Sequence, residues 1–79
     1  MKYVYILQSV IAPDRFYTGI IDDLKTRLSK HNSSSVTHTA KYWPWRLKSY
    51  VAFTDDARAI AFEKYLKSGS GRAFAKARL

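Results

Sequence analysis

The sequence predicts a small α/β domain of the α+β kind, in which helices flank a three-stranded antiparallel sheet in the order β-β-α-β-α-α. Three short segments favour strands, the first because it is rich in aromatic and β-branched residues and the third because it alternates. Three other segments follow helix-capping residues and place apolar side chains at helical spacing. At 79 residues the chain has room for one domain, so we assign 1–79 to a single unit.

The first two strands are predicted to form a hairpin. Residues 2–8, KYVYILQ, favour a buried strand, and the turn signal at 12–14 separates it from a second strand over 15–20. Gly19 ends this second strand, where a glycine permits either a backbone geometry or a close approach that a side chain would prevent. A third strand is predicted over 46–53, and we expect Tyr50 to point into the core.

The helix predicted after the hairpin places charged residues where it should face the protein. Asp22 or Asp23 can cap a helix that runs to about residue 32. At 100° per residue, His31 shares the stripe of the two leucines at 24 and 28, and Arg27 lies at the edge of that stripe. Arg27 and His31 therefore lean together toward the sheet.

A carboxylate lies within the apolar stripe of the helix predicted over 57–67, which follows a cap signal at 54–56. Glu63 is the only glutamate of the chain, and the five aspartates all occupy turn or cap positions. Burying a carboxylate is costly unless a cation, a metal ion or hydrogen-bond donors compensate. A salt bridge, for example to Arg27, or a partly exposed side chain would explain Glu63 without any catalytic role.

The last helix is predicted to begin at residues 70–71. Its spacing indicates that Ala73 and Ala77 pack with Phe74, whereas its basic side chains stay exposed.

The composition favours a polyanionic partner. The formal charge is +8, from 14 Lys and Arg against 6 acidic residues. A membrane partner is disfavoured, because the sequence has no long basic amphipathic helix and its apolar run at 3–7 is far shorter than the roughly 18 residues of a span. The chain lacks cysteine, which excludes disulfides and thiolate zinc sites, and we expect a cytoplasmic protein.

A polar, non-periodic segment from residue 33 to the aromatic residues at 42–45 is the best candidate for a functional loop. Phosphate contacts are expected from this loop and from the basic C-terminal helices. The alternative is a solvated basic surface with the tryptophans in the core, and for Trp45 we favour the core. The expected nucleic-acid-binding residues are His38, Lys41, Tyr42, Trp43, Lys67, Arg72, Lys76 and Arg78.

The order of these residues resembles a known pattern. Tyr3-Val4-Tyr5 precedes Tyr17-Thr18-Gly19, and Arg27, His31 and a helical Glu63 follow. This set resembles the GIY-YIG nuclease superfamily over nearly the whole chain. It is most similar to the small stand-alone GIY-YIG domain proteins of bacteria, which resemble the N-terminal nuclease domain of the excision-repair incision subunit.

The resemblance implies a GIY-YIG fold and an active site at specific positions of this chain. The implied catalytic residues are Tyr5, Tyr17, Arg27, His31 and Glu63. Glu63 would be the single metal-binding carboxylate, with Mg²⁺ as the ion and Mn²⁺ as a substitute. Two positions depart from the family pattern, since Tyr3 replaces a glycine and Ile20 replaces a lysine that some members carry.

The function implied is a Mg²⁺-dependent endonuclease that cleaves DNA phosphodiester bonds during DNA repair. The chain is too short for a separate specificity domain, so we expect structure-selective action on branched, nicked or damaged DNA with little sequence preference. A homodimer or a protein partner would be another source of selectivity. Two other readings stay open: a catalytically weak or inactive nucleic-acid-binding module, and an accessory protein that acts through a protein partner.

Overall fold

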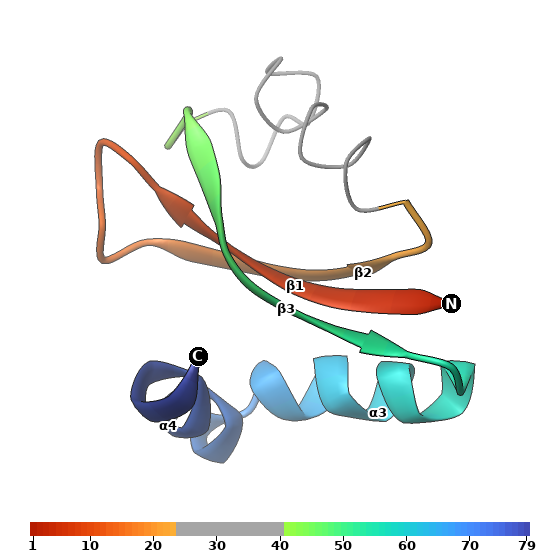
Figure 1. Ribbon diagram of the computed structural model, residues 1–79. Coiled ribbons are helices and arrows are strands. Elements are labelled where there is room, and N and C mark those ends of the chain that lie inside the picture. The colour runs from red at the N-terminus through yellow and green to blue at the C-terminus, as the bar shows by residue number, and fades with distance from the viewer. Residues whose placement is uncertain (24–40) are drawn as a thin grey trace.

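The computed structural model describes residues 1–23 and 41–79, and in these ranges the predicted three-stranded antiparallel sheet is confirmed (Figure 1). Each strand end lies within one residue of its predicted position. The helix predicted after the hairpin, up to about residue 32, falls largely outside the described residues. The described elements are β1 (Lys2–Ser9), β2 (Phe16–Ile21), β3 (Trp45–Phe53), α3 (Asp56–Leu66) and α4 (Gly69–Arg78).

Strand β1 lies at the centre of the sheet, whose order is β2-β1-β3. It pairs antiparallel with both neighbours, so that Tyr5 lies opposite Gly19 on one side and Tyr50 on the other. From Val4 to Leu7 every side chain of β1 is buried, on whichever face of the sheet it lies. The hairpin of β1 and β2 therefore fixes which residues of the two tyrosine motifs become neighbours.

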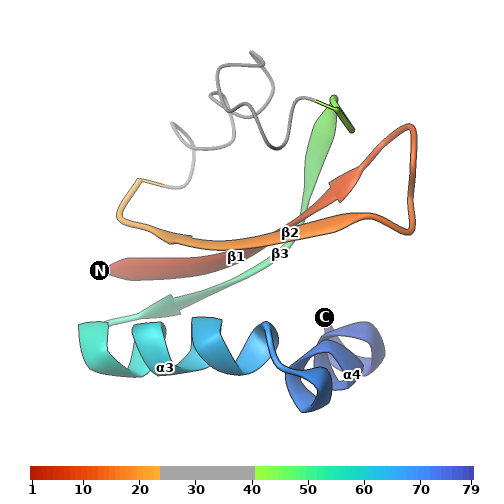
Figure 2. The ribbon, with the colours of Figure 1, turned by 180° about the vertical axis from the view of Figure 1, so that it is seen from behind.

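Two apolar clusters form on opposite faces of the sheet, as the alternation of β1 requires. On one face Val4 and Ile6 pack against Ala59 and Leu66 of α3. Figures 1 and 2 show α3 and α4 together under this face. On the other face the second cluster consists of Tyr5, Leu7 and Trp45, with partly buried side chains that include Tyr17 and Tyr42.

A register shift in β3 explains why this strand contributes to both clusters. Leu7 pairs with Leu47 but Ile6 pairs with Ser49, so Lys48 is the extra residue of a β-bulge. Before the bulge Trp45 faces the Tyr5 side, and after it Phe53 faces α3. The expectation that Tyr50 enters the core is wrong: beyond the bulge it shares the side of Tyr5, and 54% of it is exposed.

The two helices meet at a sharp corner. Asp55 caps α3 by accepting from the backbone N–H of Ala57 at 2.9 Å, and Ser68 caps α4 by accepting from the N–H of Gly71 at 3.1 Å. Gly71 is buried, because its backbone lies directly against the carbonyl of Tyr65 in the last turn of α3. Neither of these helices is long and apolar enough to cross a membrane.

The inward face of α4 differs from the predicted one. Ala73 and Ala77 are exposed, whereas Ala75 and Leu79 pack against the apolar cluster between α3 and the sheet. The reason is the close approach of Gly71, which orients α4 so that positions 71, 75 and 79, one turn apart, face inward.

Candidate functional site

Two tyrosines from neighbouring strands lie side by side on the face opposite α3. Tyr5 is 1% exposed, and its ring centroid lies 6.3 Å from that of Tyr17 with the planes inclined by 35°. This contact follows from the register, because Tyr17 is the diagonal neighbour of Tyr5 when Tyr5 pairs with Gly19. The structure therefore brings together the tyrosines of the two motifs.

Gly19 provides the space that the Tyr5 ring occupies. A Cβ at this position would overlap the Tyr5 hydroxyl oxygen and would lie 2.5 Å from Cζ of the ring. The ring thus crosses the backbone of β2, and its hydroxyl reaches the edge strand of the sheet. Of the two roles that the sequence allowed for Gly19, the structure shows the close approach, here of the Tyr5 side chain.

If the chain has the nuclease activity that its sequence resemblance implies, Gly19→Ala is expected to impair it by displacing the Tyr5 hydroxyl. The buried ring must shift to accept the methyl group, which should cost about 1–3 kcal/mol of stability and displace the hydroxyl. Tyr5→Phe is the comparison, since it removes the hydroxyl and leaves the ring in place. We expect both variants to lose cleavage in a gel assay, while urea unfolding shows Gly19→Ala to be the less stable. Wild-type cleavage by Tyr5→Phe would remove Tyr5 from the mechanism.

Glu63 lies on α3 and is turned toward the sheet, with 15% of its side chain exposed. It shares its stripe with the buried Ala59 and Leu66, as predicted. Its Oε2 atom is 2.6 Å from Nζ of Lys67, four residues further along the helix. A salt bridge is therefore present at Glu63, and its partner within the described residues is Lys67, whereas the suggested partner Arg27 lies outside them.

The donor chemistry of Glu63 fits a Mg²⁺ ion that keeps most of its water ligands. Within 1–23 and 41–79 no group of three or more His, Asp or Glu side chains is placed to enclose a metal ion. Magnesium commonly takes one or two carboxylates and several waters, so a single glutamate is sufficient on the protein side. The Lys67 side chain is 54% exposed and can leave the carboxylate when another cation binds it.

The predicted catalytic residues occupy different layers of the fold. Tyr5 and Tyr17 lie on one face of the sheet, and Glu63 lies on the helix that covers the other face. Strand β2, with Gly19, runs between them along the edge of the sheet. Arg27 and His31 fall outside the described residues, so their approach to this edge stays a prediction.

A basic groove opens on the same face as α3 and α4. It has a volume of about 630 Å³ and lies between the α3–α4 corner and the start of β2. Three residues expected to bind nucleic acid line it, and the structure adds two basic residues that the sequence analysis missed. Its basic lining residues are Arg15, Lys48, Lys67, Arg72 and Lys76.

The aromatic part of the predicted binding surface lies beside Arg15. Tyr42 packs edge-on against Trp45, and its carbonyl accepts a hydrogen bond of 2.7 Å from the buried Ser9 hydroxyl. The Arg15 guanidinium carbon and Lys41 Nζ lie 5.3 and 5.5 Å from the centroid of the Tyr42 ring. Tyr42 with Lys41 and Arg15 therefore forms a second basic surface next to the groove.

The remaining predicted binding residues are less closely grouped. Trp43 is 45% exposed, in keeping with a surface role, and Trp45 is buried as expected. Arg78 is exposed at the end of α4 but does not line the groove. His38 lies outside the described residues. The position of Arg15 at the start of the predicted second strand could have indicated a binding role. Lys48 lines the groove because of the bulge in β3, which the sequence does not indicate.

The sequence of this chain matches a known protein family. Residues 1–76 match the sequence model of the family described as the GIY-YIG catalytic domain. The chain is also similar to a protein of Lacticaseibacillus paracasei named UPF0213 protein. The two are 36% identical over 66 residues, which cover 82% of this chain and 72% of the relative. The matched range contains Tyr5, Tyr17 and Glu63.

Proposed function

Because the chain belongs to the GIY-YIG catalytic domain family, a family of endonucleases, we propose that it is a Mg²⁺-dependent endonuclease acting on DNA. The observation that supports this proposal is the contact between the Tyr5 and Tyr17 rings, with the Tyr5 ring lying over Gly19. We further propose that it acts in the cytoplasm, in DNA repair, on branched, nicked or damaged DNA.

Glu63 is the residue that would hold the ion. When bound, Mg²⁺ supplies positive charge at the scissile phosphate and favours the ionised form of a bound water. The chain itself would supply the Glu63 carboxylate, which α3 positions within its apolar stripe. Lys67 neutralises the charge of this carboxylate until the ion binds. This arrangement avoids an uncompensated buried carboxylate in the metal-free protein.

The two tyrosine hydroxyls would position the attacking water and take up its proton. A phenol, with an ordinary pKa near ~10, is a weak base at neutral pH, and neighbouring positive charge favours its ionised form. The burial of Tyr5 fixes its ring, so its hydroxyl is held at the β2 edge without loss of freedom during the reaction. Arg27 would bind the charge that develops on the phosphate, and His31 would orient a tyrosine hydroxyl.

A cleavage assay separates this proposal from its two alternatives. Labelled branched, nicked and single-stranded DNA would be incubated with the protein in Mg²⁺, in Mn²⁺ and in EDTA. We expect metal-dependent products, most abundant from the branched or nicked substrates. Binding without product in either metal would favour the non-catalytic module. Biological function that persists after loss of Glu63 would favour an accessory protein with a protein partner.

Salt dependence tests the basic surfaces. The groove and the Tyr42 surface carry six basic residues, so DNA affinity should fall steeply between 50 and 200 mM salt, by at least about tenfold. A fluorescence anisotropy titration at several salt concentrations measures this slope. An affinity that is nearly constant over that range would contradict binding through phosphates.

A further inference from the structure

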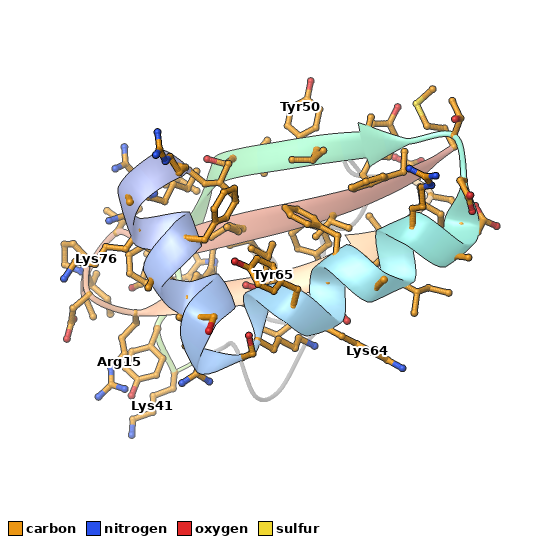
Figure 3. The ribbon with its side chains drawn as sticks, turned by 90° about the horizontal axis from the view of Figure 1, so that it is seen from below. Arg15, Lys41, Tyr50, Lys64, Tyr65 and Lys76 are labelled. Carbon is orange, nitrogen blue, oxygen red and sulfur yellow. The ribbon has the colours of Figure 1, made fainter. Side chains whose placement is uncertain are left out.

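The basic groove combines an apolar floor with a charged rim. Ile6 of β1, Leu66 of α3 and Ala75 of α4 line its inner part. Arg15 and Lys76 lie at the same end of the molecule in Figure 3, where the β1–β2 turn approaches α4. The groove is on the face opposite Tyr5 and Tyr17, so the tyrosine pair does not form any part of it.

The charge of the groove is strongly one-sided. Five basic residues line it against one acidic residue, Asp14. Within 1–23 and 41–79, Lys48, Arg72 and Lys76 form no ion pair, although all three are exposed. Like charges gathered without counter-charges repel one another and raise the affinity for an anion. The groove is therefore suited to an extended anion with several charges.

An exposed aromatic ring lies in the wall of the groove. Phe16, on edge strand β2, is 52% exposed, and Nζ of Lys48 lies 5.8 Å from its ring centroid. Exposed rings beside cations are typical of surfaces that bind single-stranded nucleic acids, where bases stack on rings and phosphates contact the cations. The groove volume of about 630 Å³ falls within the usual range of ligand clefts, about 300–1,000 Å³.

We propose that this groove binds a single-stranded segment of DNA, with its backbone along the five basic side chains and a base against Phe16. A duplex cannot offer a base face to the ring, because its bases are stacked and paired. Lys67 joins the groove to Glu63, so the bound strand would run beside the candidate metal ligand. The inference rests on the proposed nuclease function, in which this strand is the unpaired arm of a branched substrate.

The test is binding in EDTA, so that cleavage does not interfere. Fluorescein-labelled oligothymidylate of about a dozen nucleotides and a duplex of equal length would be titrated by anisotropy. Phe16→Leu is expected to weaken single-strand binding about tenfold, through loss of stacking, and to leave duplex binding unchanged. Lys76→Ala should weaken binding and reduce the salt slope for the single strand by about 0.7.

Lys64→Ala is the matched control for Lys76→Ala. Both are exposed lysines on C-terminal helices, but Figure 3 shows Lys64 extending from α3 away from the end that carries Arg15 and Lys76. We expect single-strand affinity to change less than twofold in Lys64→Ala. Circular dichroism of Phe16→Leu would verify its fold, and its exposed position makes a folding defect a poor explanation of weaker binding.

Three results would overturn the inference. These are unchanged single-strand affinity in Phe16→Leu, an equal loss in Lys64→Ala and Lys76→Ala, and displacement of the oligonucleotide by polyglutamate as readily as by unlabelled oligothymidylate. Cleavage is scored separately in Mg²⁺. Binding that depends on the groove but is not followed by cleavage would contradict the nuclease function and still support the single-strand site. Cleavage together with unchanged single-strand binding by Phe16→Leu would support the nuclease function and contradict the single-strand site.

Discussion

Glu63→Gln is expected to lower the rate of metal-dependent DNA cleavage by at least about 10²–10³-fold, the loss typical when a group that supports transition-state charge is removed. Glutamine keeps the size and shape of the side chain, so the apolar stripe of α3 that contains Ala59 and Leu66 should be undisturbed. Its neutral amide is a much poorer ligand for Mg²⁺ than a carboxylate. Single-turnover cleavage at saturating protein, with DNA binding measured in parallel, would isolate the chemical step.

Lys67→Gln is the matched control, because it breaks the same ion pair and keeps the carboxylate. If the pair matters only for structure, the two variants should lose activity alike. If Glu63 holds the ion, Lys67→Gln should keep the single-turnover rate and show weaker DNA binding, since Lys67 lines the groove. Only the Lys67 end of the pair is exposed, so Lys67→Gln leaves the largely buried carboxylate of Glu63 without its counter-charge and should be the less stable variant in urea, whereas Glu63→Gln should stay closer to wild type.

The strands were predictable from their aromatic and β-branched composition and from the turn signal between the first two, whereas the bulge in β3 was not. Residues 2–8 and 15–20 have the composition and the intervening turn signal of a hairpin, and the structure adds its register. In β3 the alternation of the sequence gives no sign that Lys48 is an extra residue without a partner in β1. The bulge reverses the faces of the strand, which is why Tyr50 is exposed and why a lysine reaches the groove.

In the candidate site, too, the contacts that follow from sequence spacing were predictable, and those that depend on the packing of helices were not. The spacing of the two tyrosine motifs places Tyr5 beside Tyr17 once the hairpin forms, so this contact could be predicted. The stripe containing Glu63 was also predictable from helical spacing. The i, i+4 spacing of Glu63 and Lys67 is sufficient to predict their ion pair, although the partner predicted for Glu63 was Arg27. The groove depends on the α3–α4 corner, which helical spacing alone cannot define.

Gly71→Ala is expected to destabilise the protein by about 2–3 kcal/mol, a large part of the stability of so small a domain. A Cβ at Gly71 would overlap the carbonyl oxygen of Tyr65 and lie 2.7 Å from Cα of Leu66. Both contacts are with backbone, so no side-chain rotation can relieve them, and α4 must move away from α3. The midpoint of thermal unfolding should fall by at least about 8 °C.

Gly69→Ala provides the control within the same helix. A Cβ at Gly69 has nothing within 4 Å, so the substitution should be neutral or stabilising by up to about 0.5 kcal/mol, through reduced freedom of the unfolded chain. Equal unfolding midpoints for the two variants would contradict the close approach of α4 to α3. Arg72 and Lys76 lie on the helix that Gly71→Ala displaces. The folded fraction of that variant should therefore lose single-strand affinity while Gly69→Ala keeps it, which makes the corner itself a determinant of binding.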